Sequence, residues 1–343
     1  MLGYDRRTLL RNVGTGALAA GLGRVFPPLA AQETKPKLPD PIPPSEAGLR
    51  QIKAEPWLQI DRGNVFLKGM AFDRRGHLTV IAAYASGPDT SLAARLDRSI
   101  LSIAPDQTVT TLFKHHGARL CDHAIHKDGR IFVACLTGEL FVINADGSSL
   151  RQIPVGWSDK PRALSDLTFD TGGNLYVTDF IGTPGNPLGG VYRYSPDLAT
   201  AELFGPRLVT PNGVAFTKGE KAMWTSCSLD KKVVKFDLSA APKIVASYGL
   251  SGPGGDGIRV DAKDNMYLSL NFQGRFLIFN AAAEPIATVL LPGHDRGELL
   301  STTNLVFKPG TDEVFAVASG ELGGTWIYKF RGLADGLPLY SHQ

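Results

Sequence analysis

Six segments with the same pattern recur along this chain. Each ends in an apolar anchor residue, continues through a short turn rich in Asp, Gly, Lys and Asn, and leads into a second β-rich run. The anchors are Phe72, Ile125, Phe169, Phe216, Val260 and Phe307. Successive anchors are 53, 44, 47, 44 and 47 residues apart, close to the about 40 to 50 residues of a four-stranded propeller blade. The spacing predicts an all-β fold, a six-bladed β-propeller with four antiparallel strands per blade.

The sixth unit is shorter than the others. It ends soon after the β-rich run 325–330, which leaves room for only three strands. We therefore expect residues near Trp57–Ile60 to supply its fourth strand. Such a splice joins the two ends of the sheet ring and removes two exposed strand edges.

Composition and charge restrict the organisation of the chain. With 343 residues and 43% hydrophobic content, the chain can bury a large core, and a closed ring uses it as one domain, here residues 49–343. The formal net charge is +3, and residues 1–31 alone sum to +3. The remainder is neutral and has no Lys/Arg run, so no nucleic-acid partner is expected.

The first 31 residues have the layout of an export signal. Arg6 and Arg7 precede a Gly/Ala/Leu stretch from Val13 to Leu22, and ten apolar residues are too few to span a bilayer. The paired arginines resemble a bacterial Tat signal, with cleavage after Ala31. On this interpretation the Tat machinery is a partner, and the mature protein is periplasmic or secreted with no membrane span. The alternative is an uncleaved N-terminal anchor or a chance pair of arginines. Five prolines in residues 32–48 predict an extended linker.

Three cysteines are too few for a disulfide scaffold. Cys121 and Cys135 flank the same turn at similar distances, so they are expected to be neighbours on adjacent strands. Either a disulfide or a pair of buried thiols is compatible with that spacing.

The repeat allows residues of different blades to be compared by their distance from the anchor. Four residues before the anchors stand Lys68, Cys121, Ser165, Asn212, Asp256 and Thr303, and three residues before them stand Gly69, Asp122, Asp166, Gly213, Gly257 and Asn304. At the next position the row is apolar except for His123. If this strand is the innermost of each blade, the two polar rows form a ring at one mouth of the central channel, above an apolar layer.

Carboxylate and amide oxygens in a narrow mouth suit Ca²⁺ or another hard divalent cation, with Asn212 and Asp256 as the candidate ligands. Asp166, one step off that row, is the candidate base for a substrate or water polarised by the cation. The alternative is that these side chains only hydrogen-bond turns and backbone.

Several stretches resemble the SMP-30/gluconolactonase/LRE family of six-bladed propellers, and the likeness runs from about Trp57 to the end of the chain. The densest stretches are Ala124–Arg130, Asn174–Phe180, Asn186–Tyr192, Gly274–Arg275 with the strand that follows, Pro292–Gly297 and Pro309–Thr311. The resemblance implies a lactone hydrolase with one catalytic divalent cation, usually Ca²⁺. That cation would be held by a Glu, an Asn matching Asn212 and an Asp matching Asp256, with Asp166 as acid/base.

The Glu of that set is missing, because the family's Glu-Gly is Lys68-Gly69 here. A protonated amine has no lone pair for a metal. Lys68 could pair with Asp256 in the place of the metal and itself stabilise an oxyanion; alternatively, a carboxylate from the insertion 84–97, such as Asp89, could replace the Glu.

The remaining residues at these positions are expected to line the substrate pocket: Cys121, Asp122, His123, Thr303, Asn304 and the loop residue His294. For His123, a hydrogen-bonded histidine in the core or pocket wall is the simpler interpretation. The sequence thus favours an exported hydrolase of lactones or related esters. The alternatives are a binding propeller without catalysis and a metal-independent enzyme like the strictosidine-synthase relatives of this fold.

Overall fold

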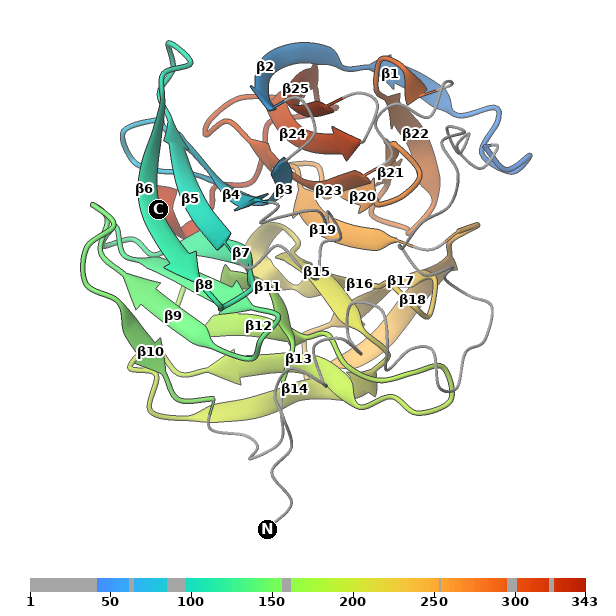
Figure 1. The fold of residues 1–343 in the computed structure, drawn as a ribbon. Helices are drawn as coiled ribbons and strands as arrows, with labels where there is room; N and C mark the ends of the chain where they lie inside the picture. The colour runs from blue at the N-terminus through green and yellow to red at the C-terminus, as the bar shows by residue number, and fades with distance from the viewer. Residues whose placement is uncertain are drawn as a thin grey trace.

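The computed structural model describes residues 42–61, 65–84, 97–155, 162–252, 254–294, 301–320 and 324–343. The strands form six sheets around a central axis, as Figure 1 shows. The chain is therefore a six-bladed β-propeller, as the anchor spacing predicts.

The blades follow one another along the chain. Blade 1 contains β3 (Val65–Phe72), β4 (Leu78–Tyr84), β5 (Asp97–Ile103) and β6 (Val109–His116); blade 2 contains β7 (Leu120–Ile125), β8 (Ile131–Cys135), β9 (Leu140–Ile143) and β10 (Arg151–Ile153). Blade 3 contains β11 (Leu164–Phe169), β12 (Leu175–Asp179), β13 (Gly189–Tyr194) and β14 (Ala201–Leu208); blade 4 contains β15 (Pro211–Phe216), β16 (Ala222–Cys227), β17 (Lys232–Asp237) and β18 (Lys243–Gly249). Blade 5 contains β19 (Gly255–Val260), β20 (Met266–Leu270), β21 (Arg275–Phe279) and β22 (Pro285–Leu290), and blade 6 contains β23 (Ser301–Phe307), β24 (Glu313–Gly320) and β25 (Gly324–Arg331).

All six anchors are the last residues of the first strands of their blades. These first strands β3, β7, β11, β15, β19 and β23 contact one another in sequence, and β23 contacts β3 to complete the circle. They are the innermost strands, so positions at equal distance from the anchor lie at the same level of the channel.

Side-chain hydrogen bonds fix the turns after the anchors. In blade 3, Asp170 Oδ1 accepts the Asn174 backbone N–H at 2.8 Å. The Gly173 N–H donates to the Asp170 carbonyl at 3.0 Å, and Gly173 has φ of 84°. Glycine adopts this left-handed conformation at little steric cost, so Asp170 and Gly173 together fix the register of the blade 3 hairpin.

The ring closes as predicted. Strand β2 (Glu55–Asp61) pairs antiparallel with β25 and completes blade 6. A strand from the beginning of the domain therefore lies beside the strand formed near its end, and this contact joins blades 6 and 1.

Two features near the start of the domain differ from the prediction. Strand β1 (Arg50–Lys53) adds to β22 in parallel, so blade 5 has five strands rather than four. Residues 42–48, expected to belong to the linker, form turns that pack against this blade: Glu46 is buried and its carboxylate pairs with Arg275 at 2.6 Å. A buried ion pair needs defined geometry, so the ordered domain begins before residue 49.

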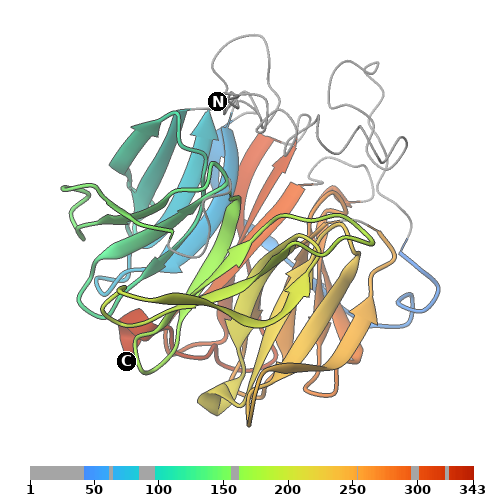
Figure 2. The same ribbon diagram turned by 90° about the horizontal axis from the view of Figure 1, so that it is seen from below.

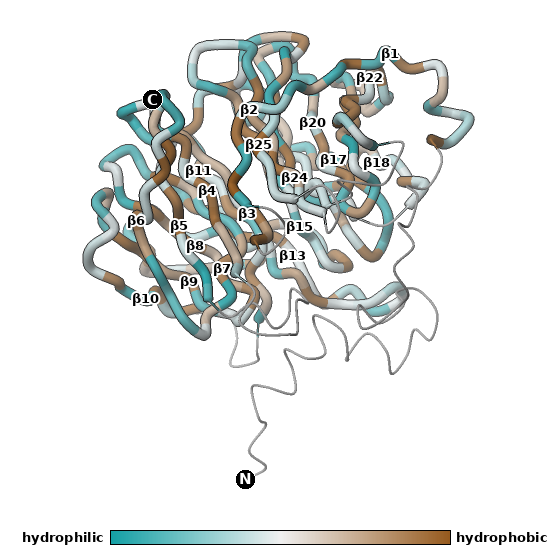
Figure 3. The backbone as a smooth tube through the Cα atoms, turned by 45° about the horizontal axis from the view of Figure 1, so that its top comes forward, coloured by the Kyte–Doolittle hydropathy of each residue, from teal (hydrophilic) through white to brown (hydrophobic). Residues whose placement is uncertain are grey.

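Burial decreases from the channel outward. The innermost strand β19 is buried at every position, whereas the outermost strand β18 contains only exposed and half-buried residues. Figure 3 shows hydrophobic stretches in brown along the strands and hydrophilic stretches in teal at many connecting turns. The apolar cores lie between neighbouring blades, because each sheet packs on both faces.

The last described segment lies at one end of the propeller, where the innermost strands terminate (Figure 2). Arg74 Nε donates to the Ser341 carbonyl at 3.0 Å, and Tyr340 stacks on Phe169 with ring centroids 5.2 Å apart. Residues 337–340 and Gln343 also face a cavity at this mouth.

Some predictions concern residues that the structure does not describe, namely the signal 1–31, linker residues 32–41 and Asp89. Within the described ranges, no helix is long and apolar enough to cross a membrane. Cys121 and Cys135 lie on the adjacent strands β7 and β8, as expected. Both are buried thiols and not a disulfide.

Candidate functional site

Each innermost strand is irregular at the level of the polar rows. The pairing register shifts between Lys68 and Met70, Leu120 and Asp122, Leu164 and Leu167, Pro211 and Val214, Gly255 and Ile258, and Thr302 and Asn304. A β-bulge sets two residues of one strand against one residue of its partner and re-aims the side chains. Polar side chains at consecutive positions can therefore gather around one channel, which regular strand alternation does not allow.

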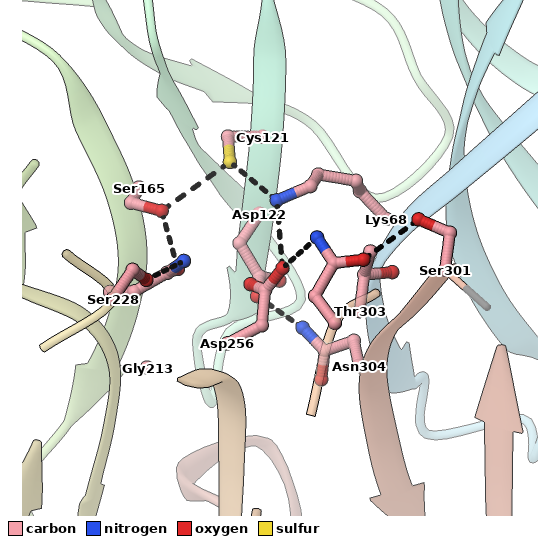
Figure 4. Close-up of polar contacts among 12 residues, drawn as sticks. Lys68, Cys121, Asp122, Ser165, Gly213, Ser228, Asp256, Ser301, Thr303 and Asn304 are labelled. Atoms are coloured by element: carbon pink, nitrogen blue, oxygen red, sulfur yellow. Dashed lines mark hydrogen bonds and ion pairs between the residues drawn. The ribbon is translucent and has the colours of Figure 1, made fainter. Parts of the chain in front are cut away.

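The outer layer of the channel mouth centres on Lys68 (Figure 4). Its Nζ lies 3.4 Å from Asp256 Oδ2 and 3.7 Å from Cys121 Sγ. Asp256 Oδ2 also accepts from Asn271 Nδ2 at 3.3 Å, and Asn271 Oδ1 accepts from Ser301 Oγ at 2.8 Å. Residues from blades 1, 2, 5 and 6 thus meet at one point, although they are far apart in sequence.

A second chain of hydrogen bonds runs around the other side of the mouth. Cys121 Sγ lies 3.5 Å from Ser165 Oγ, which donates to Asn212 Oδ1 at 2.7 Å. Asn212 Nδ2 donates to Ser228 Oγ at 3.1 Å. Blades 2, 3 and 4 are joined in this way, and the two chains meet at Cys121.

Lys68 keeps its charge in this setting. Burial by itself lowers the pKa of its amine, but nearby negative charge, chiefly the Asp256 carboxylate, outweighs burial and holds that pKa well above its ordinary value. Burial raises the pKa of the Asp256 carboxyl, against the opposing effect of Lys68. Burial likewise raises the pKa of the Cys121 thiol. The mouth therefore contains an ammonium beside a carboxylate and a neutral thiol.

A deeper polar layer lies one position further along the strands. Asp122 Oδ2 accepts from Asn304 Nδ2, and both side chains lie over glycines of adjacent blades. A Cβ at Gly69 would come within 2.7 Å of Asp122 Oδ1, and one at Gly257 within 2.8 Å of Asn304 Oδ1. The glycines of this row therefore leave the space that the polar side chains of the neighbouring blades occupy.

Asp122 and Asp166 interact electrostatically within this deeper layer. Burial and the negative charge of Asp166 raise the pKa of Asp122 well above its ordinary value. Asp166 accepts the backbone N–H of Leu167 on Oδ1 at 2.7 Å and that of Val214 on Oδ2 at 2.9 Å. Burial also raises the pKa of Asp166, but the charge of Arg259 and these backbone N–H groups oppose that rise, so Asp122 is the carboxyl of the pair that is driven more strongly towards its protonated form.

Replacing Asp166 by asparagine is expected to destabilise the propeller. The amide has one acceptor oxygen, so its NH₂ group would face one of the two backbone N–H groups that Asp166 now accepts. A buried donor without a partner costs about 1–3 kcal/mol. Urea unfolding of Asp166→Asn measures this loss, and a midpoint equal to that of the wild type would contradict the described bonding. Asp335 is exposed, so Asp335→Asn makes the same chemical change at the surface and serves as the matched control.

His123 lies in the layer below and belongs to the wall, as the simpler interpretation predicts. Thr79 Oγ1 donates to the Ala71 carbonyl at 2.9 Å and lies 2.7 Å from His123 Nε2. Since Thr79 has one hydroxyl proton, His123 must donate from Nε2. Burial, together with the smaller effect of the Arg259 charge, lowers the pKa of His123 to about 3.

His123 is expected to weaken the fold in acid. Its folded pKa is below the unfolded value of about 6.5, so its contribution to stability is present above pH 6.5 and is lost as the pH falls towards 3. As the pH falls through this range, protonation of His123 should lower the free energy of unfolding by up to about 1.4 kcal/mol per pH unit. Comparing the urea midpoints of the wild type and His123→Gln across this pH range isolates the contribution of His123. Parallel pH curves for the two proteins would refute the assignment.

The structure thus gathers most of the predicted residues at one mouth: Lys68, Cys121, Asp122, His123, Asp166, Asn212, Asp256, Thr303 and Asn304 are all buried around the channel. Thr303 Oγ1 donates to the Leu67 carbonyl at 2.8 Å, so it ties blade 6 to blade 1. His294 is buried and its backbone N–H donates to the Leu291 carbonyl. Its place in a substrate pocket stays a prediction.

Four residues of the channel escaped the sequence analysis. Ser228 and Asn271 directly follow the second strands β16 and β20. Aligning the second strands of the six blades, as was done for the first strands, would have revealed this position. Ser301 begins β23. Arg259 directly precedes its anchor, where the other five blades have Ala71, Ala124, Thr168, Ala215 and Val306; one charged residue among small or aliphatic ones was the available signal.

The side chains of the outer layer do not fit a calcium ion. Calcium takes six to eight oxygen ligands, whereas Asp256 Oδ2 accepts from Lys68 and Asn271, and Asn212 Oδ1 accepts from Ser165. The Lys68 ammonium already lies 3.4 Å from Asp256 Oδ2. Among the described residues, no three His, Cys, Asp or Glu side chains are grouped to hold a metal.

The geometry supports a different use of the same charges. A carbonyl oxygen at the mouth could accept a hydrogen bond from Lys68, which would stabilise negative charge that develops on it. Asp256 lies beside that ammonium and has a basicity raised by burial, which suits a general base. Asp166 lies one layer deeper, and backbone N–H groups occupy both of its oxygens.

Comparison with known proteins agrees with this architecture. Residues 96–312 match the model of the SMP-30/gluconolactonase/LRE-like region. A protein named lactonase drp35 from Staphylococcus saprophyticus is 35% identical over 314 residues, 88% of this chain and 93% of that protein. Its namesake from Staphylococcus aureus is 32% identical over 315 residues, with 87% and 93% covered.

Solved structures show the same fold at lower identity. Regucalcin from Agrobacterium tumefaciens, described as a calcium-binding protein, superposes with a TM-score of 0.64 at 15% identity and covers 85% of this chain and 99% of its own. A gluconolactonase from Xanthomonas campestris gives 0.60 at 17% identity, with 88% and 99% covered. Both likenesses concern the fold. On the family match and the identity to the lactonases, the chain belongs to the SMP-30/gluconolactonase/LRE-like family.

Proposed function

We propose that this chain is an exported hydrolase of lactones or related esters whose channel mouth uses the Lys68 ammonium where relatives would use a cation. The observation that carries the proposal is the Lys68–Asp256 pair at 3.4 Å within a ring of polar side chains from all six blades. Relatives named lactonases at 31–35% identity supply the substrate class.

The reaction follows from two groups. The substrate carbonyl oxygen accepts a hydrogen bond from Lys68 Nζ, and a water molecule attacks the carbonyl carbon while Asp256 removes its proton. The ammonium stabilises the oxyanion that forms. When the ring C–O bond breaks, Asp256 returns the proton to the departing alkoxide oxygen. The product is a hydroxy carboxylic acid, which releases its acidic proton to solvent and leaves as the hydroxy carboxylate.

Several neighbours position these two groups. Asn271 donates to the Asp256 oxygen that also faces Lys68, and Ser301 fixes the Asn271 amide. Cys121 packs against the ammonium on its other side. Because Asn271 and Cys121 already hold these two charged groups in place, the groups lose little conformational freedom when substrate binds, which favours catalysis.

Lactone hydrolysis by purified protein, with and without a chelator, tests the proposal. We expect activity on a panel of aliphatic and aromatic lactones that the chelator leaves unchanged. Activity abolished by the chelator and restored by Ca²⁺ would instead support the calcium-dependent reaction that the family resemblance implies. No activity on lactones or esters would favour a binding propeller without catalysis.

Export is proposed from residues 1–31, through the Arg6-Arg7 pair. A fusion of these residues to a reporter that is active only outside the cytoplasm should be exported. Replacing both arginines by lysine should stop that export, because the Tat machinery reads the arginine pair. Unchanged export of the lysine variant would exclude the Tat route.

A further inference from the structure

A cavity of about 360 Å³ lies at the channel mouth opposite the polar ring. The ends of the innermost strands form its walls, and the segment 337–340 with Gln343 lies against it. Most of its lining is apolar, with side chains such as Met70, Leu167 and Val214 nearest the channel. A concave apolar space with few polar groups is the usual form of a small-molecule site.

Arg259 separates this cavity from the polar ring. Its Nη1 donates to the Ile258 carbonyl at 2.7 Å and its Nη2 to the Met70 carbonyl at 3.2 Å. Nη1 also lies 3.9 Å from Asp166 Oδ2. These contacts reach blades 5, 1 and 3, so the guanidinium is held across the channel.

The Nε–H group of this guanidinium has no partner among the described residues. Arg259 is 8% exposed and lines the cavity. Leaving a buried charged donor unpaired is costly. The arrangement therefore points to an acceptor that enters from the cavity.

The acids near this mouth are already engaged. Asp166 accepts two backbone N–H groups. Glu220, which lines the cavity, accepts the backbone N–H of Thr171 at 2.6 Å and its hydroxyl at 3.0 Å. Lys218 adds a second positive charge to the lining. An incoming anion would thus meet Arg259 without displacing a carboxylate.

We propose that this cavity is a second ligand site, separate from the polar ring, for a small carboxylate with an apolar body. The carboxylate accepts from Arg259, since guanidinium groups bind carboxylates through charge-assisted hydrogen bonds. The apolar body packs on the strand-end side chains, where each buried CH₂ contributes about 0.8 kcal/mol. The site does not depend on lactone hydrolysis, because none of its lining belongs to the Lys68–Asp256 pair.

Phenylacetate and its neutral isostere phenylacetamide are suitable probes, measured by calorimetry on the mature protein. We expect saturable phenylacetate binding that Arg259→Gln weakens by about tenfold or more, equal to about 1.4 kcal/mol. Phenylacetamide should bind the wild type at least about tenfold more weakly, because it lacks the charge. Equal affinity for the two probes, or no loss in Arg259→Gln, would overturn the proposal.

Two further variants locate the site. Thr168 lines the cavity and is half-buried, so Thr168→Phe fills the space while Arg259 stays intact, and it should also abolish binding. Lys68→Met removes the other channel cation and should leave binding unchanged. Binding that survives Thr168→Phe, or is lost in Lys68→Met, would assign the carboxylate to the polar ring instead. Thr168→Phe also provides the test if Arg259→Gln does not fold.

Discussion

Lys68→Met is expected to lower kcat/KM for lactone hydrolysis by about 10²- to 10³-fold, the loss seen when one oxyanion donor is removed from a hydrolase. Methionine keeps an unbranched apolar stem of similar length but brings no charge. The loss should fall mainly on kcat, because the negative charge that Lys68 stabilises develops only in the transition state. Steady-state kinetics on one good lactone substrate measures both parameters.

Two controls make this result specific. Lys329 forms a partly exposed pair with Glu313 at 3.7 Å, near the anchor end of blade 6 and away from the polar ring, so Lys329→Met removes one positive charge outside the site and should leave kcat unchanged. Lys68→Arg keeps the charge with a different shape and should recover part of the rate. A Lys68→Met enzyme as fast as the wild type, and equally well folded by circular dichroism, would remove Lys68 from the reaction.

Lys68→Glu is expected to make the protein bind calcium. The substitution exchanges an ammonium for a carboxylate beside Asp256 and Asn212, so the local charge changes by two units and oxygen donors face one another. Two carboxylates left without a cation repel each other, which should lower the stability of the metal-free variant. Calcium at a concentration of about a hundred times its Kd should then raise the free energy of unfolding of this variant by about 2.7 kcal/mol. Thermal unfolding with increasing Ca²⁺ measures this without any assay of activity.

The wild type and a neutral variant complete that experiment. Neither the wild type nor Lys68→Met should be stabilised to the same extent by calcium, since neither has the second carboxylate. Chelator should reverse the stabilisation of Lys68→Glu. If calcium stabilises the wild type as strongly as Lys68→Glu, then Lys68 does not occupy the cation's position, and the cation-dependent reaction becomes the better account.

Much of the architecture was predictable because a repeat carries its own register. Six anchors of apolar type predicted six innermost strands, and each strand ends at its anchor. The short sixth unit predicted the closing strand β2. Strand β1 and the Glu46–Arg275 pair were not predictable, because they depend on contacts between the start of the domain and blade 5.

The same logic governs the site. The repeat placed Asn212, Asp256 and Asp166 at one mouth, since rotation about the channel brings equal offsets to equal heights. The repeat could not show how far along the channel each of these side chains lies. Asp166 bonds two backbone amides in a lower layer, while Asp256 faces Lys68 in the outer one, because the bulges turn consecutive side chains to different levels.

The sequence by itself determined the number of blades, their order, the closure of the ring and the mouth of the channel at which polar side chains gather, because these follow from local pattern and spacing. Only the tertiary structure decided which charges pair. Lys68 reaches Asp256 across 188 positions, and Arg259 crosses the channel to Met70 across 189. Such contacts depend on side-chain direction and on the space that neighbouring glycines leave, and neither is encoded in the local sequence of any single blade.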